Sequence, residues 1–160
     1  MVMNGSVMTT KKERLANKEK NKMKVTYEIK DGKKVKVKTY ADGTVFKYDE
    51  NGNEIYRKYY SGLEEWREYD NDETMIYFKN SLGYEEWYEY DTNRNEIHTW
   101  NNRGYERWLA YDSNGNEIHT WDNRGYEDWN EYDAYRICIH FKANNGIEWF
   151  DEHYEARKIC

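Results

Sequence analysis

Three histidines recur at a spacing of 21 residues and are the first candidates for chemistry in this chain. His98, His119 and His140 each stand near acidic residues and tryptophans. Histidine is a common metal ligand and a common general base near neutral pH, so three of them on one face could hold zinc or move a proton. The choice between these roles and structural pairing depends on the elements that carry the histidines.

The same 21-residue period runs through most of the chain. Tyr-Asp pairs, isoleucines, glycines and tryptophans all keep it without slippage. A fixed period of this size indicates a repeat protein. The Tyr-Asp pairs begin at Tyr48, Tyr69, Tyr90, Tyr111 and Tyr132.

Each repeat has the pattern of two strands and two turns. Asn-Gly at residues 51–52 and 114–115 predicts a two-residue turn with positive φ, whereas Gly104 and Gly125 after Asn-Arg predict a three-residue turn. A two-residue turn joins opposed residues an odd number apart, and a three-residue turn joins residues an even number apart. One turn of each kind therefore accounts for an odd period.

This turn placement predicts the cross-strand pairs. Equivalent strands of a meander lie about 9.6 Å apart, too far for two histidines to share a zinc ion that binds its ligands at about 2.0–2.1 Å. We therefore expect structural ion pairs, with no metal and no cofactor. The predicted pairs are Tyr111 with Ile118, Trp108 with Trp121, Tyr90 with Ile97, Trp87 with Trp100, Glu89 with His98, Glu131 with His140, Trp129 with Lys142, and Ala110 with His119.

The acidic residues offer no catalytic pattern either. Asp49, Asp70, Asp91 and Asp112 each precede a turn, where aspartate accepts hydrogen bonds from backbone N–H groups, and their spacing does not suit a calcium loop. The chain has no phosphate-binding glycine loop and no nucleophile elbow. We therefore expect a protein that is not an enzyme.

The predicted fold class is all-β, an antiparallel meander of 21-residue β-hairpin repeats that forms one long twisted or curled sheet. Residues 1–22 are expected to be a basic leader, flexible or partly helical. Residues 23–153 form the array, with an initial hairpin at 23–47, repeats at about 48–145 and a degenerate cap at 146–153. Residues 154–160 form a tail.

Charge is divided unevenly along the chain. Residues 1–40 contain 12 Lys/Arg and four Asp/Glu, whereas residues 41–160 contain 13 and 27. The acidic repeats disfavour direct nucleic-acid binding, except through the Lys-rich residues 11–38, and they favour basic protein surfaces. The chain has two cysteines, no apolar run of transmembrane length and no secretory signal at residues 1–10, so we expect a location in the cytoplasm of a bacterial host and no membrane partner.

One sheet face is expected to carry tryptophans, histidines and acids, and this face is the candidate binding surface. Tryptophan is among the residues that most often anchor protein interfaces. The candidate partner-binding residues are Trp87, Trp100, Trp108, Trp121, Glu85, Glu86, Glu106, Asp122 and Glu127.

The stretch Gly104–Ile118 resembles the tyrosine-aspartate (YD, or Rhs-type) repeats of bacterial surface and toxin proteins. The resemblance covers about residues 43–153 and implies a β-hairpin array, although Asn53 and Asn116 stand where that family usually has arginine. The segments G-Y-E-R-W and G-Y-E-E-W are also similar to MORN-type repeats, which implies a binding platform. Neither resemblance implies a catalytic residue.

Charge, size and architecture together favour a non-enzymatic protein-binding module. We expect an inhibitor that docks an acidic aromatic sheet on a basic, nucleic-acid-binding protein such as a nuclease, as a phage anti-CRISPR or other defence inhibitor would. A carbohydrate- or cell-wall-binding repeat protein is the alternative. Pairing with a second copy, as a homodimer, would also cover an aromatic face.

Overall fold

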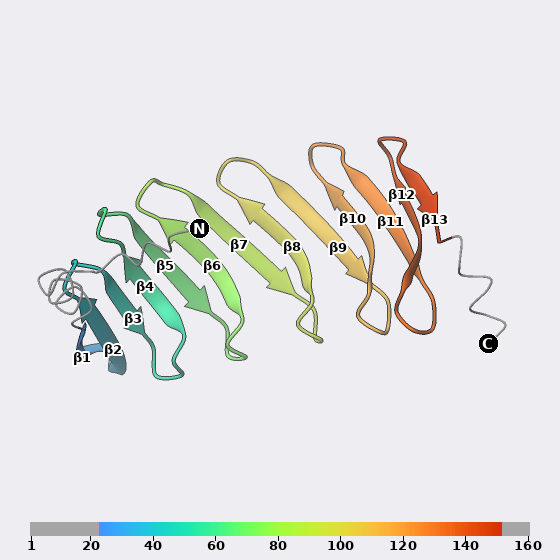
Figure 1. Cartoon of the computed structure of the whole chain (residues 1–160). Helices are drawn as coiled ribbons and strands as arrows, with labels where there is room; N and C mark the ends of the chain where they lie inside the picture. Colours follow the sequence, from blue (N-terminus) through green and yellow to red (C-terminus); the bar gives the residue numbers. More distant parts are fainter. Residues whose placement is uncertain (1–22, 152–160) are drawn as a thin grey trace, which may run out of the picture. The chain divides into compact units, whose positions relative to one another are not determined.

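The computed structural model describes residues 23–151, which form an all-β fold with 13 antiparallel strands in one open sheet (Figure 1). The strands follow one another in sequence order, which confirms the predicted meander. No helix occurs in this part of the chain, and so none that could cross a membrane. The expected leader (1–22), tail (154–160) and last residues of the cap lie outside the described residues.

The strand bounds follow the sequence pattern closely. The strands are β1 (Met23–Lys30), β2 (Lys33–Tyr40), β3 (Val45–Tyr48), β4 (Glu54–Lys58), β5 (Glu64–Tyr69), β6 (Met75–Asn80), β7 (Glu85–Tyr90), β8 (Glu96–Asn101), β9 (Glu106–Tyr111), β10 (Glu117–Asp122), β11 (Glu127–Tyr132), β12 (Cys138–Ala143) and β13 (Glu148–Phe150).

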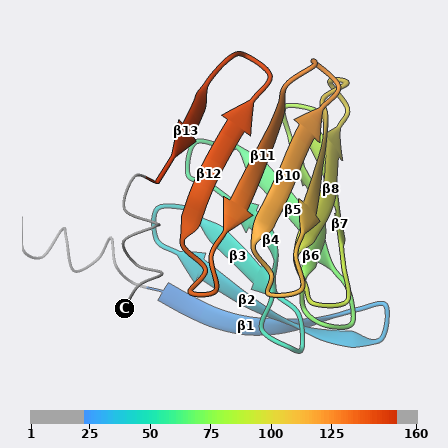
Figure 2. The ribbon, with the colours of Figure 1, turned by 90° about the vertical axis from the view of Figure 1, so that its right-hand side faces the viewer.

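The chain divides into two compact units. Within the described residues, the first comprises residues 23–68 with Asn80–Leu82, and the second comprises Tyr69–Lys79 with residues 83–151. Strands β1 to β4 belong to the first unit and strands β7 to β13 to the second. Figure 2 shows consecutive strands of the second unit, β10 to β12, side by side.

The β1–β2 hairpin has the two-residue turn that its Asp-Gly sequence favours. Asp31 and Gly32 both have positive φ, 51° and 77°, and Lys30 lies opposite Lys33. Positive φ at both central residues defines the type I′ turn, whose twist matches that of the flanking strands.

Within a repeat, however, both turns contain three residues. The N–H of Gly115 donates to the carbonyl of Asp112 at 3.0 Å, and the N–H of Asp112 donates to the carbonyl of Asn116 at 3.0 Å. Gly115 has a φ of 78°, whereas Asn114 has no positive φ. The prediction of a two-residue turn at Asn114-Gly115 is therefore wrong.

A β-bulge supplies the odd residue of the 21-residue period. Beside the turn, Tyr111 lies opposite Glu117, and the register then shifts so that Ala110 lies opposite His119. Ile118 is the extra residue, so the predicted pairing of Tyr111 with Ile118 is wrong. Such a bulge places two residues of one strand opposite one residue of its partner.

Four of the isoleucines that keep the period are such bulge residues. In the preceding repeat Tyr90 lies opposite Glu96 rather than the predicted Ile97. The same shift occurs at Ile55 and Ile139. Beyond each bulge the predicted register holds, and it confirms the pairs Trp108 with Trp121, Trp87 with Trp100, Glu89 with His98, Glu131 with His140, Trp129 with Lys142, and Ala110 with His119.

Aspartates close the Tyr-Asp turns as predicted. Oδ1 of Asp112 accepts from the N–H groups of Asn114 at 2.8 Å and Asn116 at 2.9 Å, and Oδ2 accepts from the Asn116 amide at 2.8 Å. These bonds, first that from the Asn116 backbone, hold the pKa of Asp112 below its ordinary value. Equivalent backbone bonds are made by Asp49, Asp70, Asp91 and Asp133.

The other set of turns lies at the opposite ends of the strands, and asparagines there link a hairpin to the preceding one. The N–H of Asn123 donates to the Glu106 carbonyl at 3.0 Å, its Oδ1 accepts from the Glu106 N–H at 3.2 Å, and its Nδ2 donates to the Gly104 carbonyl at 2.6 Å. Asn102 and Asn144 repeat this arrangement. The side chain thus continues the strand ladder into the turn.

The described strands of each unit belong to one sheet, and deep burial is rare. No described side chain is completely buried. The sheet is therefore stabilised by cross-strand pairs, which contribute about 0.2–1 kcal/mol each, and by its turn hydrogen bonds, more than by a core. The most buried residues are Val35, Val37, Thr99, Leu109, Asn116, Thr120, Asp128 and Ala143.

The three-residue turns predict a stabilising glycine substitution. Glu73 is exposed and has a φ of 64°, and it occupies the turn position that Gly115 occupies two repeats later. Glu73→Gly should raise the free energy of unfolding by about 0.5–1 kcal/mol, because a side chain is disfavoured at this φ. Urea unfolding measures the change. Asn71→Gly, in the same turn at a residue without positive φ, is the control and should destabilise by about 0.5 kcal/mol.

The asparagine links predict a graded loss of stability. Asn123→Ala removes two side-chain hydrogen bonds to backbone and should lower the free energy of unfolding by about 1–2 kcal/mol. Asn123→Ser should lose less, because Ser81, with the equivalent role, still accepts from the Glu64 N–H at 3.1 Å. Asn93 is exposed in the turn that follows Tyr90-Asp91, and Asn93→Ala should change stability by less than about 0.5 kcal/mol. Equal effects of Asn123→Ala and Asn93→Ala in thermal unfolding would contradict this role.

Candidate interaction face

One face of the second unit carries a continuous row of aromatic rings, stacked from Trp87 onward. Tyr77 lies opposite Trp87 and Trp87 opposite Trp100, which joins strands β6, β7 and β8. The row continues over β9, β10 and β11, and we call this surface the indole face. The ring centroids are separated by 5.5 Å for Tyr77–Trp87, 6.0 Å for Trp87–Trp100, 4.6 Å for Trp100–His98, 5.1 Å for His98–Trp108, 6.0 Å for Trp108–Trp121, 4.6 Å for Trp121–His119 and 5.1 Å for His119–Trp129.

Histidines complete the row by filling the spaces between indoles. The ring of His98 is tilted by 26° to Trp100 and by 7° to Trp108, so it is stacked on both. His119 has the same arrangement one repeat later, with Trp121 and Trp129. The 21-residue recurrence of histidine therefore reflects a place in the stack.

Carboxylates on the same face flank the histidines, as the cross-strand register predicted. Nδ1 of His98 lies 3.3 Å from Glu89, and its Nε2 lies 3.6 Å from Glu106. Nε2 of His119 lies 3.0 Å from Glu127, whereas Ala110 stands on its other side. Each histidine is thus held against at least one carboxylate.

His140, at the far end of this face, has a carboxylate on each ring nitrogen. Its Nε2 lies 3.0 Å from Glu148 and its Nδ1 lies 3.3 Å from Glu131. The hydrogen bond with Glu148, followed by that with Glu131, raises the pKa of His140 above its ordinary value despite some desolvation. The protonated ring is therefore favoured in the folded protein.

Seven of the nine predicted binding residues lie together on the indole face. The four tryptophans, Trp87, Trp100, Trp108 and Trp121, form its centre. The three glutamates are placed by their opposed residues, which are Lys79 for Glu85, Trp100 for Glu106 and Trp121 for Glu127.

Glu86 and Asp122 do not join this face. Successive side chains of a strand point to opposite faces, so Glu86 lies across the sheet from Trp87. There it accepts from the Tyr88 hydroxyl at 2.6 Å. Asp122 closes a turn by accepting from the N–H groups of Arg124 and Tyr126, both at 2.9 Å.

The opposite face holds a half-buried polar row that the sequence did not reveal. Because of the bulges, Glu96 and Glu117 lie opposite tyrosines. Nη2 of Arg107 lies 3.8 Å from Glu117. Burial raises the pKa of Glu96, Arg107 lowers it, and Glu86 and Glu117 raise it further. These acids form structural pairs within the sheet and are not part of an exposed binding surface.

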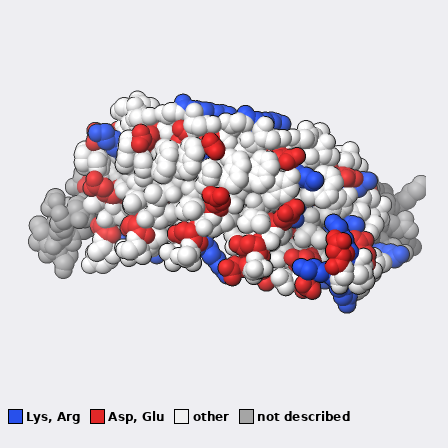
Figure 3. Space-filling model, turned by 180° about the vertical axis from the view of Figure 1, so that it is seen from behind, with Lys and Arg blue, Asp and Glu red and all other residues white. Residues whose placement is uncertain are grey.

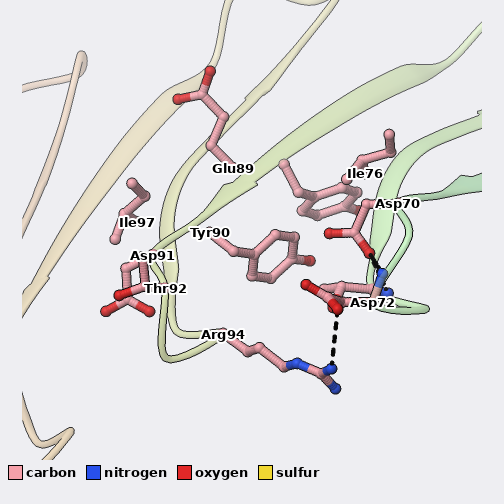
Figure 4. Close-up of a pocket in the computed structure, with 11 residues that line it drawn as sticks. Asp70, Asp72, Ile76, Glu89, Tyr90, Asp91, Thr92, Arg94 and Ile97 are labelled. Carbon is pink, nitrogen blue, oxygen red and sulfur yellow. Dashed lines mark hydrogen bonds and ion pairs between the residues drawn. The ribbon is translucent and has the colours of Figure 1, made fainter.

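A shallow depression of about 520 Å³ lies beside the β5–β6 and β7–β8 turns (Figure 4). Its aspartates Asp70 and Asp91 are engaged by turn N–H groups. Arg94 reaches Asp72 at 3.6 Å, and the Tyr90 hydroxyl donates to the Met75 carbonyl at 2.9 Å. Within residues 23–151 no group of three or more His, Cys, Asp or Glu is arranged to hold a metal ion.

The carboxylates of the indole face are accessible. The side chains of Glu106 and Glu127 are 42% and 40% exposed, whereas their histidine partners are more buried. Because both carboxylates are exposed, the indole face combines flat rings with negative charge. On the side of the molecule drawn in Figure 3, acidic side chains are spread among uncharged ones, with Lys and Arg mainly at the upper border and lower right.

The contacts of His140 predict a pH dependence. When folding raises the pKa of a histidine, the stabilisation is complete at pH values below the pKa of the unfolded chain, about 6.5. It is lost as pH rises through the pKa of the folded protein. Unfolding should therefore be harder at pH 6 than at pH 8. NMR titration of the His140 ring should give a midpoint above 6.5, lowered more by Glu148→Gln than by Glu131→Gln. An unchanged midpoint in both variants would contradict these ion pairs.

Comparisons with known proteins assign no family to this chain. No protein-family model matches the sequence, and no curated protein is significantly similar to it. The functional argument therefore depends on the contacts and charges of the chain itself.

Proposed function

We propose that this chain is a non-enzymatic protein-binding module whose indole face docks on a basic protein. The observation that carries the proposal is the row of stacked rings with accessible carboxylates on the same face, as at Trp108 and Glu106. Rings supply a flat apolar contact at low conformational cost, and carboxylates favour a basic partner.

The stacking preorganises the rings of the indole face for binding. Trp108 is held between His98 and Trp121, so its ring has little freedom to lose when a partner covers it. Side chains that are already ordered reduce the entropy that association costs. An arginine of the partner could lie on an indole ring and reach Glu106 or Glu127 with its guanidinium, a geometry that lysine cannot reproduce.

The charge supports a protein partner over nucleic acid. Binding of single-stranded nucleic acid to aromatic rings requires a basic groove beside them. Here glutamates flank the row, with Lys79 and Lys142 as basic neighbours that themselves oppose Glu85 and Glu148. A basic, nucleic-acid-binding protein fits this surface, and inhibition of a nuclease, as by an anti-CRISPR protein, is the specific form of the proposal.

The test uses immobilised basic nucleases, with a CRISPR effector complex among them, and a glycan array. Binding to one of the proteins should weaken strongly between about 50 and 300 mM NaCl. Glu106→Lys should reduce affinity and its salt dependence, and Trp108→Ala should reduce affinity at least tenfold.

Two further variants separate this surface from others. Glu86 lies on the opposite face, so Glu86→Gln should leave affinity unchanged. Glu127 lies on the indole face one repeat after Glu106, so Glu127→Lys should reduce affinity as Glu106→Lys does. Circular dichroism of each variant checks that it is folded. Binding only to glycans, or binding to a nuclease that ignores both salt and Glu106→Lys, would overturn the proposal.

A further inference from the structure

Strand β1 ends the sheet and leaves one edge without a partner in the described part of the chain. It pairs with β2, and no described strand follows it on the other side (Figures 1 and 2). Its apolar side chains are exposed, from 41% for Val25 to 72% for Ile29, with Met23 and Tyr27 between these values. A long exposed edge with apolar residues is a template for another strand.

The two-residue turn determines which backbone groups of β1 face outward. Lys30 and Lys33 flank that turn, so they form a hydrogen-bonded pair, and such pairs alternate along an antiparallel ladder. Lys24, Thr26 and Glu28 therefore direct their N–H and C=O groups toward β2. The backbone groups of the apolar residues, from Met23 to Ile29, point outward.

We propose that two copies of this chain associate through their β1 edges, antiparallel and with a two-fold axis at Thr26. In this register Val25 lies opposite Tyr27 of the second copy, and Thr26 lies opposite its own equivalent. Outward-facing residues then meet outward-facing residues, which gives roughly eight backbone hydrogen bonds across the interface.

The side chains of β1 complement themselves in this register. Lys24 lies opposite Glu28 of the second copy, and two-fold symmetry makes this ion pair twice. Aromatic–β-branched, Thr–Thr and unlike-charge pairs are all favourable in antiparallel sheets. Moving the axis to Tyr27 would put Lys24 opposite Lys30, and moving it to Glu28 would put that glutamate opposite itself.

Glu28 remains available for this contact. It already pairs with Lys47 of its own chain at 2.7 Å, yet 41% of its side chain stays exposed. One carboxylate can accept several hydrogen bonds and so serve both lysines. The proposed contact lies in the first unit and does not involve the indole face, so it is independent of the proposed function.

Charge variants test the register in the full chain. Sedimentation velocity under reducing conditions should show a dimer that Lys24→Glu weakens at least about tenfold, because two attractive pairs become repulsive. Glu28→Lys should do the same. An equimolar mixture of the two variants should restore the dimer, since every contact is then between unlike charges. Lys33→Glu, an equal charge change at the β1–β2 turn, should have little effect.

Cross-linking tests the position of the axis. In a chain with Cys138→Ser and Cys160→Ser, Thr26→Cys should form an intermolecular disulfide with oxidised glutathione, because opposed Cβ atoms lie about 4.5–5.5 Å apart. Lys24→Cys should not, because its equivalent lies about 14 Å away. A wild-type chain that stays monomeric up to ~1 mM, or a dimer with equal cross-linking at both positions, would overturn the proposal.

Discussion

The β-bulge beside each Tyr-Asp turn is the constraint on which the arrangement of side chains depends. Two three-residue turns alone would give an even repeat, and the bulge isoleucine makes it odd. Because side chains alternate along a strand, that single residue decides which acids face the tryptophans. Glu117 turns to the tyrosine face, while His119 turns to the indoles.

Few described residues are buried, so the order of the sheet comes mainly from contacts between neighbouring strands and turns. Aspartates such as Asp112 close one set of turns, and asparagines such as Asn123 join the other set to the preceding hairpin. Between the turns, rings stack in a row across the strands. A regular lattice of modest interactions thus replaces a core, and it leaves aromatic and acidic groups accessible for binding.

Much of this fold could be predicted from the period, and the errors share one physical cause. An Asn-Gly pair suits a two-residue turn, but Asp112 and Gly115 have the same spacing as Asn101 and Gly104, which indicates two turns of one type. The tryptophan pairs were predicted correctly because the bulge restores that register beyond Ile118. The residues beside the turn could not be assigned to a face of the sheet from the sequence, because the bulge determines the side to which they point.

The asparagine links and the buried acids were harder to foresee. An asparagine in a turn usually serves its own turn, whereas Asn123 bonds to a glycine carbonyl 19 residues earlier. Glu96 looks like an ordinary surface acid in the sequence, and only the shifted register buries it near Arg107. Glu86 lies across the sheet from Trp87 for a simpler reason, because adjacent residues of a strand face opposite sides.

Nuclear Overhauser contacts across β9 and β10 in solution test the central claim most directly. The bulge predicts backbone contacts between Tyr111 and Glu117, together with ring contacts between Trp108 and Trp121. Contacts between Tyr111 and Ile118 in place of those with Glu117 would show a two-residue turn without a bulge. That result would contradict the assignment of the acids to the two faces.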